Sequence, residues 1–96
     1  MKPSDALRVY RDEIRRAVES HRAYNGRVFG SAVRGDDVDG SDLDLLVDAL
    51  PGTTLFDLGG LQIELEELLG IPIDILTPGD LPPKFRDRVL SEAVPI

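Results

Sequence analysis

The sequence contains no cysteine, no tryptophan and only one histidine. The absence of cysteine excludes disulfide bonds and thiolate metal sites, and it is compatible with a reducing compartment. No stretch approaches the ~20 consecutive apolar residues that a membrane-spanning helix needs, and the first residues, MKPSDALRVY, lack the apolar segment of a secretory signal. We therefore expect a cytoplasmic protein that does not contact a membrane.

Basic residues are also scarce, with 11 Lys and Arg against 18 Asp and Glu, for a net charge of −7. Broad contact with a nucleic-acid backbone needs clustered Lys and Arg, so we expect no direct nucleic-acid binding. The acidic excess suits a basic protein partner or bound cations. A chain of 96 residues, 42% hydrophobic and 30% charged, predicts a single globular domain over residues 1–96 with one modest core.

Hydrophobic periodicity predicts strands that alternate with helices. Strands are expected at 27–29, 43–47 and 71–76, and helices at 4–22, at 54–69 and from Pro82 or Pro83 to about Ala93. Residues 30–35 are expected to form a turn, and residues 36–41 a polar loop. This alternation predicts a small α/β sandwich.

The expected helix ends rest on capping residues. Ser4 is a plausible N-cap of the first helix, and Asn25-Gly26 is a plausible stop. The second helix is expected to end at Gly70. Its predicted apolar face consists of Leu58, Leu61, Leu65 and Leu68.

Two aspartates stand at the head of the second predicted strand. Because side chains alternate across a strand, Asp42 and Asp44 project to one face and Leu43 projects to the other. The Cα atoms of the two aspartates lie ~6.6 Å apart at ~3.3 Å per residue, so their carboxylates can converge on one or two ions. The alternative is that both are solvated edge or loop residues, since aspartate is depleted in strand interiors.

A third aspartate lies in the segment IPIDIL. The same alternation directs Asp74 away from Ile73 and Ile75, so it would join the acidic face if the two strands pair. Unpaired carboxylates on one face repel each other. A hard divalent cation would resolve this repulsion, and magnesium held by a few carboxylates and by substrate phosphates is the usual form.

Gly30 and Ser31 follow the first predicted strand and open a tight turn. Such a turn exposes backbone N–H groups that suit an anion such as phosphate. Glycine lets the backbone approach a ligand closely, and the Ser31 hydroxyl adds a donor. This turn, followed by the D-x-D pair and then by a later aspartate, is a more specific pattern than any of the three alone.

Two other ligand-binding motifs do not match this sequence, and the remaining charged residues are expected to lie at the surface. GSAVRGDD has the glycine spacing of a P-loop, but Asp36 and Asp37 stand where Lys and Ser or Thr are required. GDDVDGSDLDLL lacks the first ligand and the final glutamate of a calcium loop. His21 is expected to be a surface residue or a partner of the helix dipole at a C-terminal end. Solvated helix faces are expected for Glu64, Glu66 and Glu67 and for Lys84, Arg86 and Arg88.

The segments GSAVRGDDVDGSDLDLLV and IPIDIL resemble the nucleotidyltransferase superfamily of the DNA polymerase β type, over nearly the whole chain. Together with the ending LSEAVPI, they resemble its minimal, MntA-like branch. The resemblance implies a small mixed β-sheet flanked by helices. It implies that Gly30 and Ser31 contact a nucleoside triphosphate such as ATP. It also implies that Asp42, Asp44 and Asp74 are the catalytic carboxylates and that they bind two Mg²⁺ ions.

The implied activity is transfer of a nucleotidyl group with release of pyrophosphate, in which Asp74 positions or deprotonates the attacking hydroxyl. Arg34 either helps to bind the triphosphate or a partner, or is a solvated arginine in the turn. The short chain leaves no room for a separate acceptor domain, so we expect the acceptor to be a protein. The MntA-like branch implies an antitoxin that transfers AMP from ATP to a tyrosine of a HepT-like toxin, a ribonuclease of the HEPN class.

Two alternatives remain open at this point. The first is an antitoxin that acts by binding alone and whose active site is a relic; the intact GS turn, D-x-D pair and Asp74 weigh against it. The second is a nucleotidyltransferase that acts on a small molecule, which the missing acceptor domain disfavours. A magnesium-dependent assay with the partner present would separate these alternatives from the enzyme acting on a protein.

Overall fold

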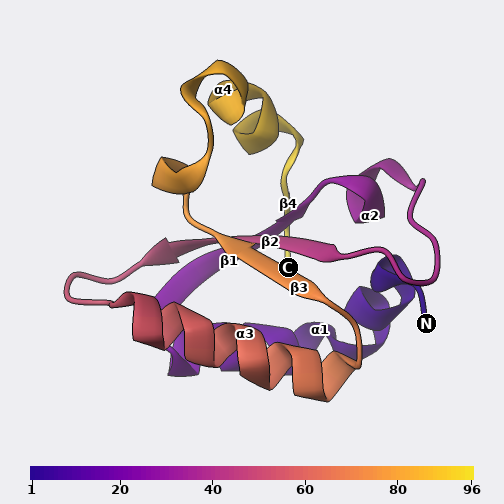
Figure 1. The fold of residues 1–96 in the computed structure, drawn as a ribbon, viewed down its shortest axis with the longest axis horizontal. Coiled ribbons are helices and arrows are strands. Elements are labelled where there is room, and N and C mark those ends of the chain that lie inside the picture. The colour runs from indigo at the N-terminus through magenta and orange to yellow at the C-terminus, as the bar shows by residue number, and fades with distance from the viewer.

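The structure is a computed structural model that describes residues 1–96, with helices packed on a four-stranded sheet (Figure 1). Its helices are α1 (Pro3–Ser20), α2 (Ser31–Arg34), α3 (Leu55–Leu69) and α4 (Pro83–Glu92), with the 3-10 turn η1 at Pro78–Asp80. Its strands are β1 (Ala23–Phe29), β2 (Leu43–Ala49), β3 (Ile73–Leu76) and β4 (Val94–Pro95).

The sheet is mixed, with the strand order β3-β2-β1-β4. β1 pairs antiparallel with both β2 and β4, whereas β2 and β3 are parallel. Parallel neighbours need a crossover connection, which α3 provides between β2 and β3. The small mixed sheet flanked by helices that the sequence predicted is therefore confirmed.

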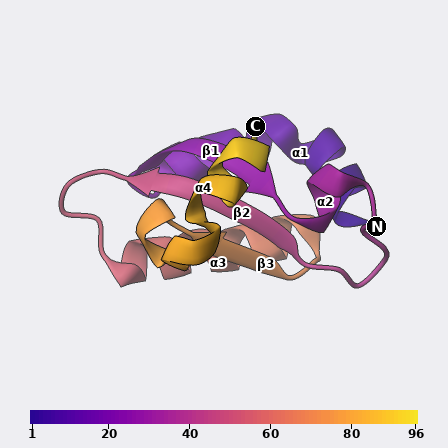
Figure 2. The same ribbon diagram turned by 90° about the horizontal axis from the view of Figure 1, so that it is seen from above.

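The main core lies between one face of the sheet and the helices α1 and α3, which run along that face (Figure 1). Leu43, Leu45 and Val47 of β2 point into it and are fully buried. The opposite face carries Asp44 and Leu46, and α4 stands over it (Figure 2). Leu46 is also fully buried, because η1 contacts β2 there and the adjoining Leu81 is buried as well.

The sequence-based boundaries between α1 and β1 were wrong. Helix α1 begins at Pro3, after Lys2 as N-cap, and Ser4 lies within its first turn. Strand β1 begins at Ala23, so Asn25 and Gly26 lie inside the strand and do not end the helix. Asn25 has a φ of 54°, and the β1–β2 register shifts there, which marks a β-bulge. Asparagine adopts this conformation readily in bulges as well as in turns, so the residue type did not distinguish them.

The predicted apolar face of α3 was wrong at its C-terminal end. Leu69 is the buried residue of the last turn, and Leu68 remains 36% exposed. The prediction that Glu66 is solvated was also wrong, because its carboxylate accepts the N–H of Ile73 at 3.2 Å. That bond links the end of α3 to the start of β3.

The C-terminal part of the chain holds two elements that periodicity missed. Strand β4 has two residues and η1 has three, and both are too short to show a hydrophobic period. Helix α4 has no buried residue. The guanidinium of Arg86 donates to the carbonyl of Leu81 at 2.9 Å, so Arg86 is tied to the preceding loop and is not simply solvated. None of the helices combines the length and apolar content that a bilayer crossing requires.

The neighbouring residues Leu68 and Leu69 give a matched test of the core. We expect Leu69→Ala to lower the free energy of unfolding by ~2–4 kcal/mol, because it removes a side chain that is 7% exposed and leaves a cavity. Leu68→Ala should cost less than about 1 kcal/mol. Urea unfolding of both variants measures the difference; equal losses would contradict the assignment of Leu69 to the core.

Candidate nucleotide-binding site

The predicted site residues gather at one end of the sheet face opposite the core. Phe29, the last residue of β1, pairs with Asp44 of β2, and Asp44 pairs in turn with Asp74 of β3. The turn of Gly30 and Ser31 follows Phe29 directly, so the pairing of β1 with β2 brings this turn next to Asp44. Three segments that are distant in the sequence thus meet through strand register alone.

Gly30 lies against the Asp44 carboxylate. A Cβ placed on Gly30 would overlap Asp44 Oδ2, and the φ of Gly30 is +80° with a ψ of −150°, a region that L side chains rarely adopt. Both the space and the backbone conformation therefore require glycine. The sequence predicted a close approach of this backbone to a ligand; the structure adds that the backbone also lies close to a carboxylate.

Asp44 is half-buried and sits among other carboxylates. Burial raises its pKa to about 6, with additional repulsion from Asp74 and Asp42, while the charge of Arg34 acts in the opposite direction. An ionised carboxylate is stabilised in such a place only by a positive partner. The protein's own side chains supply little of that charge at Asp44.

Asp42 and Asp74 are both exposed. Asp42 lies just before β2 and not within it, and Asp74 belongs to the edge strand β3. No three His, Cys, Asp or Glu side chains are arranged as ligands around one point. Asp74 nevertheless lies close enough to Asp44 to raise the pKa of that carboxyl.

This donor set fits a hard divalent cation that shares its coordination with substrate. Oxygen ligands from a few carboxylates are what Mg²⁺ takes, and Mg²⁺ usually keeps water or phosphate oxygens in its remaining positions. Such a cation would stabilise the ionised form of the half-buried Asp44, whose charge lacks a full positive partner.

Ser31 opens α2, which is a single turn of four residues. The first N–H groups of a helical turn have no carbonyl acceptor within it, and they lie beside the partly buried Ser31 side chain. Arg34 ends the same turn, and its Nε lies 3.5 Å from Asp36 Oδ2 in an exposed ion pair. The turn therefore offers polar donors next to the carboxylate cluster.

The loop between α2 and β2 contains a residue that the sequence analysis assigned no role. Asp37 is 6% exposed, and its Oδ2 accepts the N–H of Ser4 at 2.8 Å. That hydrogen bond lowers the pKa of Asp37. A run of aspartates in a polar loop gives no signal of which one is buried, so only the tertiary structure distinguishes Asp37 from Asp36 and Asp39.

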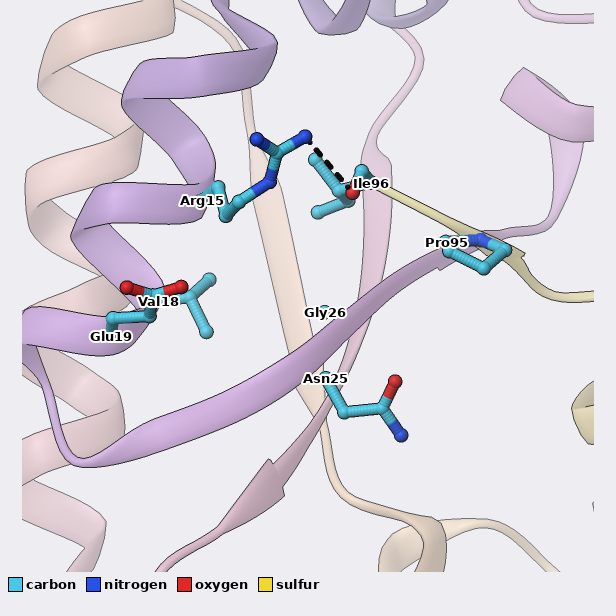
Figure 3. Close-up of a pocket in the computed structure, with 7 residues that line it drawn as sticks. All are labelled: Arg15, Val18, Glu19, Asn25, Gly26, Pro95 and Ile96. Atoms are coloured by element: carbon cyan, nitrogen blue, oxygen red, sulfur yellow. Dashed lines mark hydrogen bonds between the residues drawn. The ribbon is translucent and has the colours of Figure 1, made fainter.

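A pocket of about 170 Å³ lies elsewhere, between α1, β1 and β4 (Figure 3). Gly26 of β1 is one of its lining residues, and the Arg15 guanidinium donates to the carbonyl of Ile96 at 3.3 Å. None of the carboxylates described above lines it. The pocket is therefore separate from the candidate site on the open sheet face.

Comparisons with known proteins place the chain in a family. The family model described as "Nucleotidyltransferase domain" matches residues 11–96. The candidate protein adenylyltransferase MJ0435 of Methanocaldococcus jannaschii is 41% identical over 79% of this chain and 82% of its own length. The protein adenylyltransferase MntA of Thermococcus cleftensis is 39% identical over 70% of this chain and 68% of its own length.

Solved structures agree with these sequence relatives. The structure of a candidate minimal nucleotidyltransferase superposes with a TM-score of 0.87 at 42% identity and covers 97% of this chain and 95% of its own. A chain from a toxin–antitoxin crystal structure with AMP-PNP has a TM-score of 0.74 at 17% identity, over 88% of this chain and 69% of its own, and shares the fold. On these matches, the chain belongs to the nucleotidyltransferase domain family.

Proposed function

We propose that this chain is an antitoxin that transfers AMP from ATP to a tyrosine of a HEPN-type ribonuclease toxin and thereby neutralises it. The observation that carries the proposal is the contact of the Gly30 backbone with the Asp44 carboxylate, with Asp74 on the neighbouring strand. This contact supports the proposal because the turn proposed to bind phosphate lies beside a carboxylate proposed to bind a cation. A nucleotidyl transfer needs both.

In this proposal the turn at Gly30 and Ser31 holds the triphosphate, with Arg34 at its edge. Asp42, Asp44 and Asp74 would hold two Mg²⁺ ions, which would neutralise the charge of the phosphates. The acceptor oxygen bonds to the α-phosphorus while the bond to the β-phosphate oxygen breaks, and pyrophosphate leaves. Asp74, exposed at the sheet edge, accepts the hydroxyl proton.

The protein acceptor is supported by the relatives and by charge. Both sequence relatives are named as protein adenylyltransferases, and a structural neighbour comes from a toxin–antitoxin complex with AMP-PNP. The net charge of −7 favours association with a basic, RNA-handling partner. An AMP group on the toxin adds bulk and negative charge next to a site that must accept anionic RNA.

The raised pKa of Asp44 predicts a pH dependence of stability in the absence of metal. The folded-state pKa of about 6 exceeds the ordinary value of 3.8, so folding favours the protonated form. Stability should therefore fall as the pH rises from about 4 to about 6. Asp44→Asn should remove this fall and be more stable than the wild type at pH 7. Urea unfolding across that range measures the effect.

The exposed Asp39 provides the control for that experiment, since Asp39→Asn should keep the wild-type profile. Asp44→Asn should also abolish AMP transfer while the protein stays folded, and Mg²⁺-dependent nucleotide binding by the wild type should weaken below about pH 6, because protons compete with the cation. Full transfer activity in Asp44→Asn would contradict the role proposed for this carboxylate.

Gly30 and Gly59 form a matched pair for the turn. Gly30→Ala should abolish nucleotide binding, because its Cβ would displace the Asp44 carboxylate. Gly59→Ala, in α3 with open space around it, should keep nucleotide binding and gain up to ~1 kcal/mol of stability.

Ser31→Ala should weaken nucleotide binding by about 1.5–3 kcal/mol. Calorimetric titration with ATP and Mg²⁺ checks all three; unimpaired binding by Gly30→Ala would show that the turn is structural only.

The catalytic proposal is tested with the cognate toxin, ATP and Mg²⁺. Mass spectrometry should show a toxin carrying AMP on a tyrosine, with pyrophosphate released. Substoichiometric amounts of this chain should suffice, and the inhibition should persist after the two proteins are separated. An unmodified toxin, inhibited only at equal stoichiometry and equally well by Asp42→Asn, would show an antitoxin that acts by binding alone.

A further inference from the structure

The loop of residues 35–42 delivers Asp42 to the site, yet most of it is exposed. The side chains of Asp36 and Asp39 are 63% and 82% exposed, and Val38 is 62% exposed. Within the loop, Ser41 and Val38 exchange two hydrogen bonds of 3.0 Å. Local turn bonds of this kind shape a loop but do not fix its position relative to the rest of the protein.

Asp37 is the exception, and it is the only charged residue of the chain that is buried. Its partner, the Ser4 N–H, is 33 residues away in the sequence and belongs to the first turn of α1. N–H groups of a first helical turn lack an intrahelical acceptor, and Lys2 as N-cap supplies no side-chain acceptor. The Asp37 carboxylate accepts the Ser4 N–H, so the buried carboxylate and the helix donor each have a hydrogen-bond partner.

The end of α1 is a rigid anchor for the loop. Pro3 and Ala6 in its first turns are buried, and Ala6 belongs to the core beneath β2. The loop, α2 and the start of α1 lie at the same end of the molecule (Figure 2). A bond from Asp37 to this anchor therefore restrains the segment that connects the Gly30 turn to Asp42 and Asp44.

We infer that Asp37 is a positioning residue for the nucleotidyl transfer. By holding loop 35–42 against the first turn of α1, it places Asp42 beside Asp44 in the geometry that metal and nucleotide require. The inference rests on the proposed function for its catalytic consequence, whereas the tether itself is a property of the loop and can be measured separately.

Hydrogen exchange of the wild-type chain and three variants tests the tether. Asp37→Ala removes the acceptor and should raise the exchange rate of the loop amides 36–42 by about tenfold, with β2 and α3 unchanged. Asp37→Asn keeps an oxygen that can accept the Ser4 N–H and should restore most of the protection. Asp39→Ala is the matched control in the same loop: it removes only the exposed ion pair of 3.3 Å between Asp39 and the Met1 ammonium. Exposed ion pairs contribute little, so this variant should behave as the wild type.

Binding of AMP-PNP with Mg²⁺, measured by calorimetry on the same proteins, tests the positioning role. Affinity should fall roughly tenfold in Asp37→Ala, as for other residues that orient metal ligands, and should be largely recovered in Asp37→Asn. Wild-type exchange in Asp37→Ala would overturn the tether, and faster exchange with unchanged binding would overturn the positioning role. A wild-type chain that does not bind AMP-PNP would refute the proposed function itself, and this inference with it.

Discussion

The site depends on one close approach, that of the Gly30 backbone to the Asp44 carboxylate. It requires a residue without a side chain at the end of β1 and a carboxylate directly opposite on β2, which the Phe29–Asp44 pairing provides. The result is a half-buried negative charge with neutral backbone on one side and further carboxylates on the other. Such a charge costs free energy unless a positive partner meets it.

The sheet makes this arrangement possible because β2 separates two environments. Leu43, Leu45 and Val47 anchor the strand in the core, and the alternate residues face the open side. A slip of one residue would bury the aspartates and expose the leucines, so the core fixes the register of the acidic face. Parallel pairing with β3 then places Asp74 next to Asp44 through the register of the backbone.

Periodicity predicted the alternation of strands and helices and the acidic face, whereas the mixed sheet was implied by the family resemblance. The alternation in SDLDLLV gives the strand, its buried face and its acidic face at once. The errors arose where a local signal has two structural meanings. Asn25-Gly26 occurs in a β-bulge as readily as in a turn, and Leu68 and Leu69 satisfy the helical period about equally well. Asp37 could not be found, since its burial depends on a helix that is 33 residues away in the sequence.

The bulge in β1 also bears on how the protein behaves at high concentration. Strand β4 pairs with Arg27 and Val28, and the N–H of Ile96 donates to the carbonyl of Gly26 at 3.0 Å, so only the first residues of β1 form a free edge of the sheet. A free, flat edge can pair with the same edge of another molecule and start aggregation. The left-handed backbone at Asn25 interrupts the regular row of hydrogen-bonding groups at that point. The bulge thus makes this edge a poor template for pairing with a second molecule.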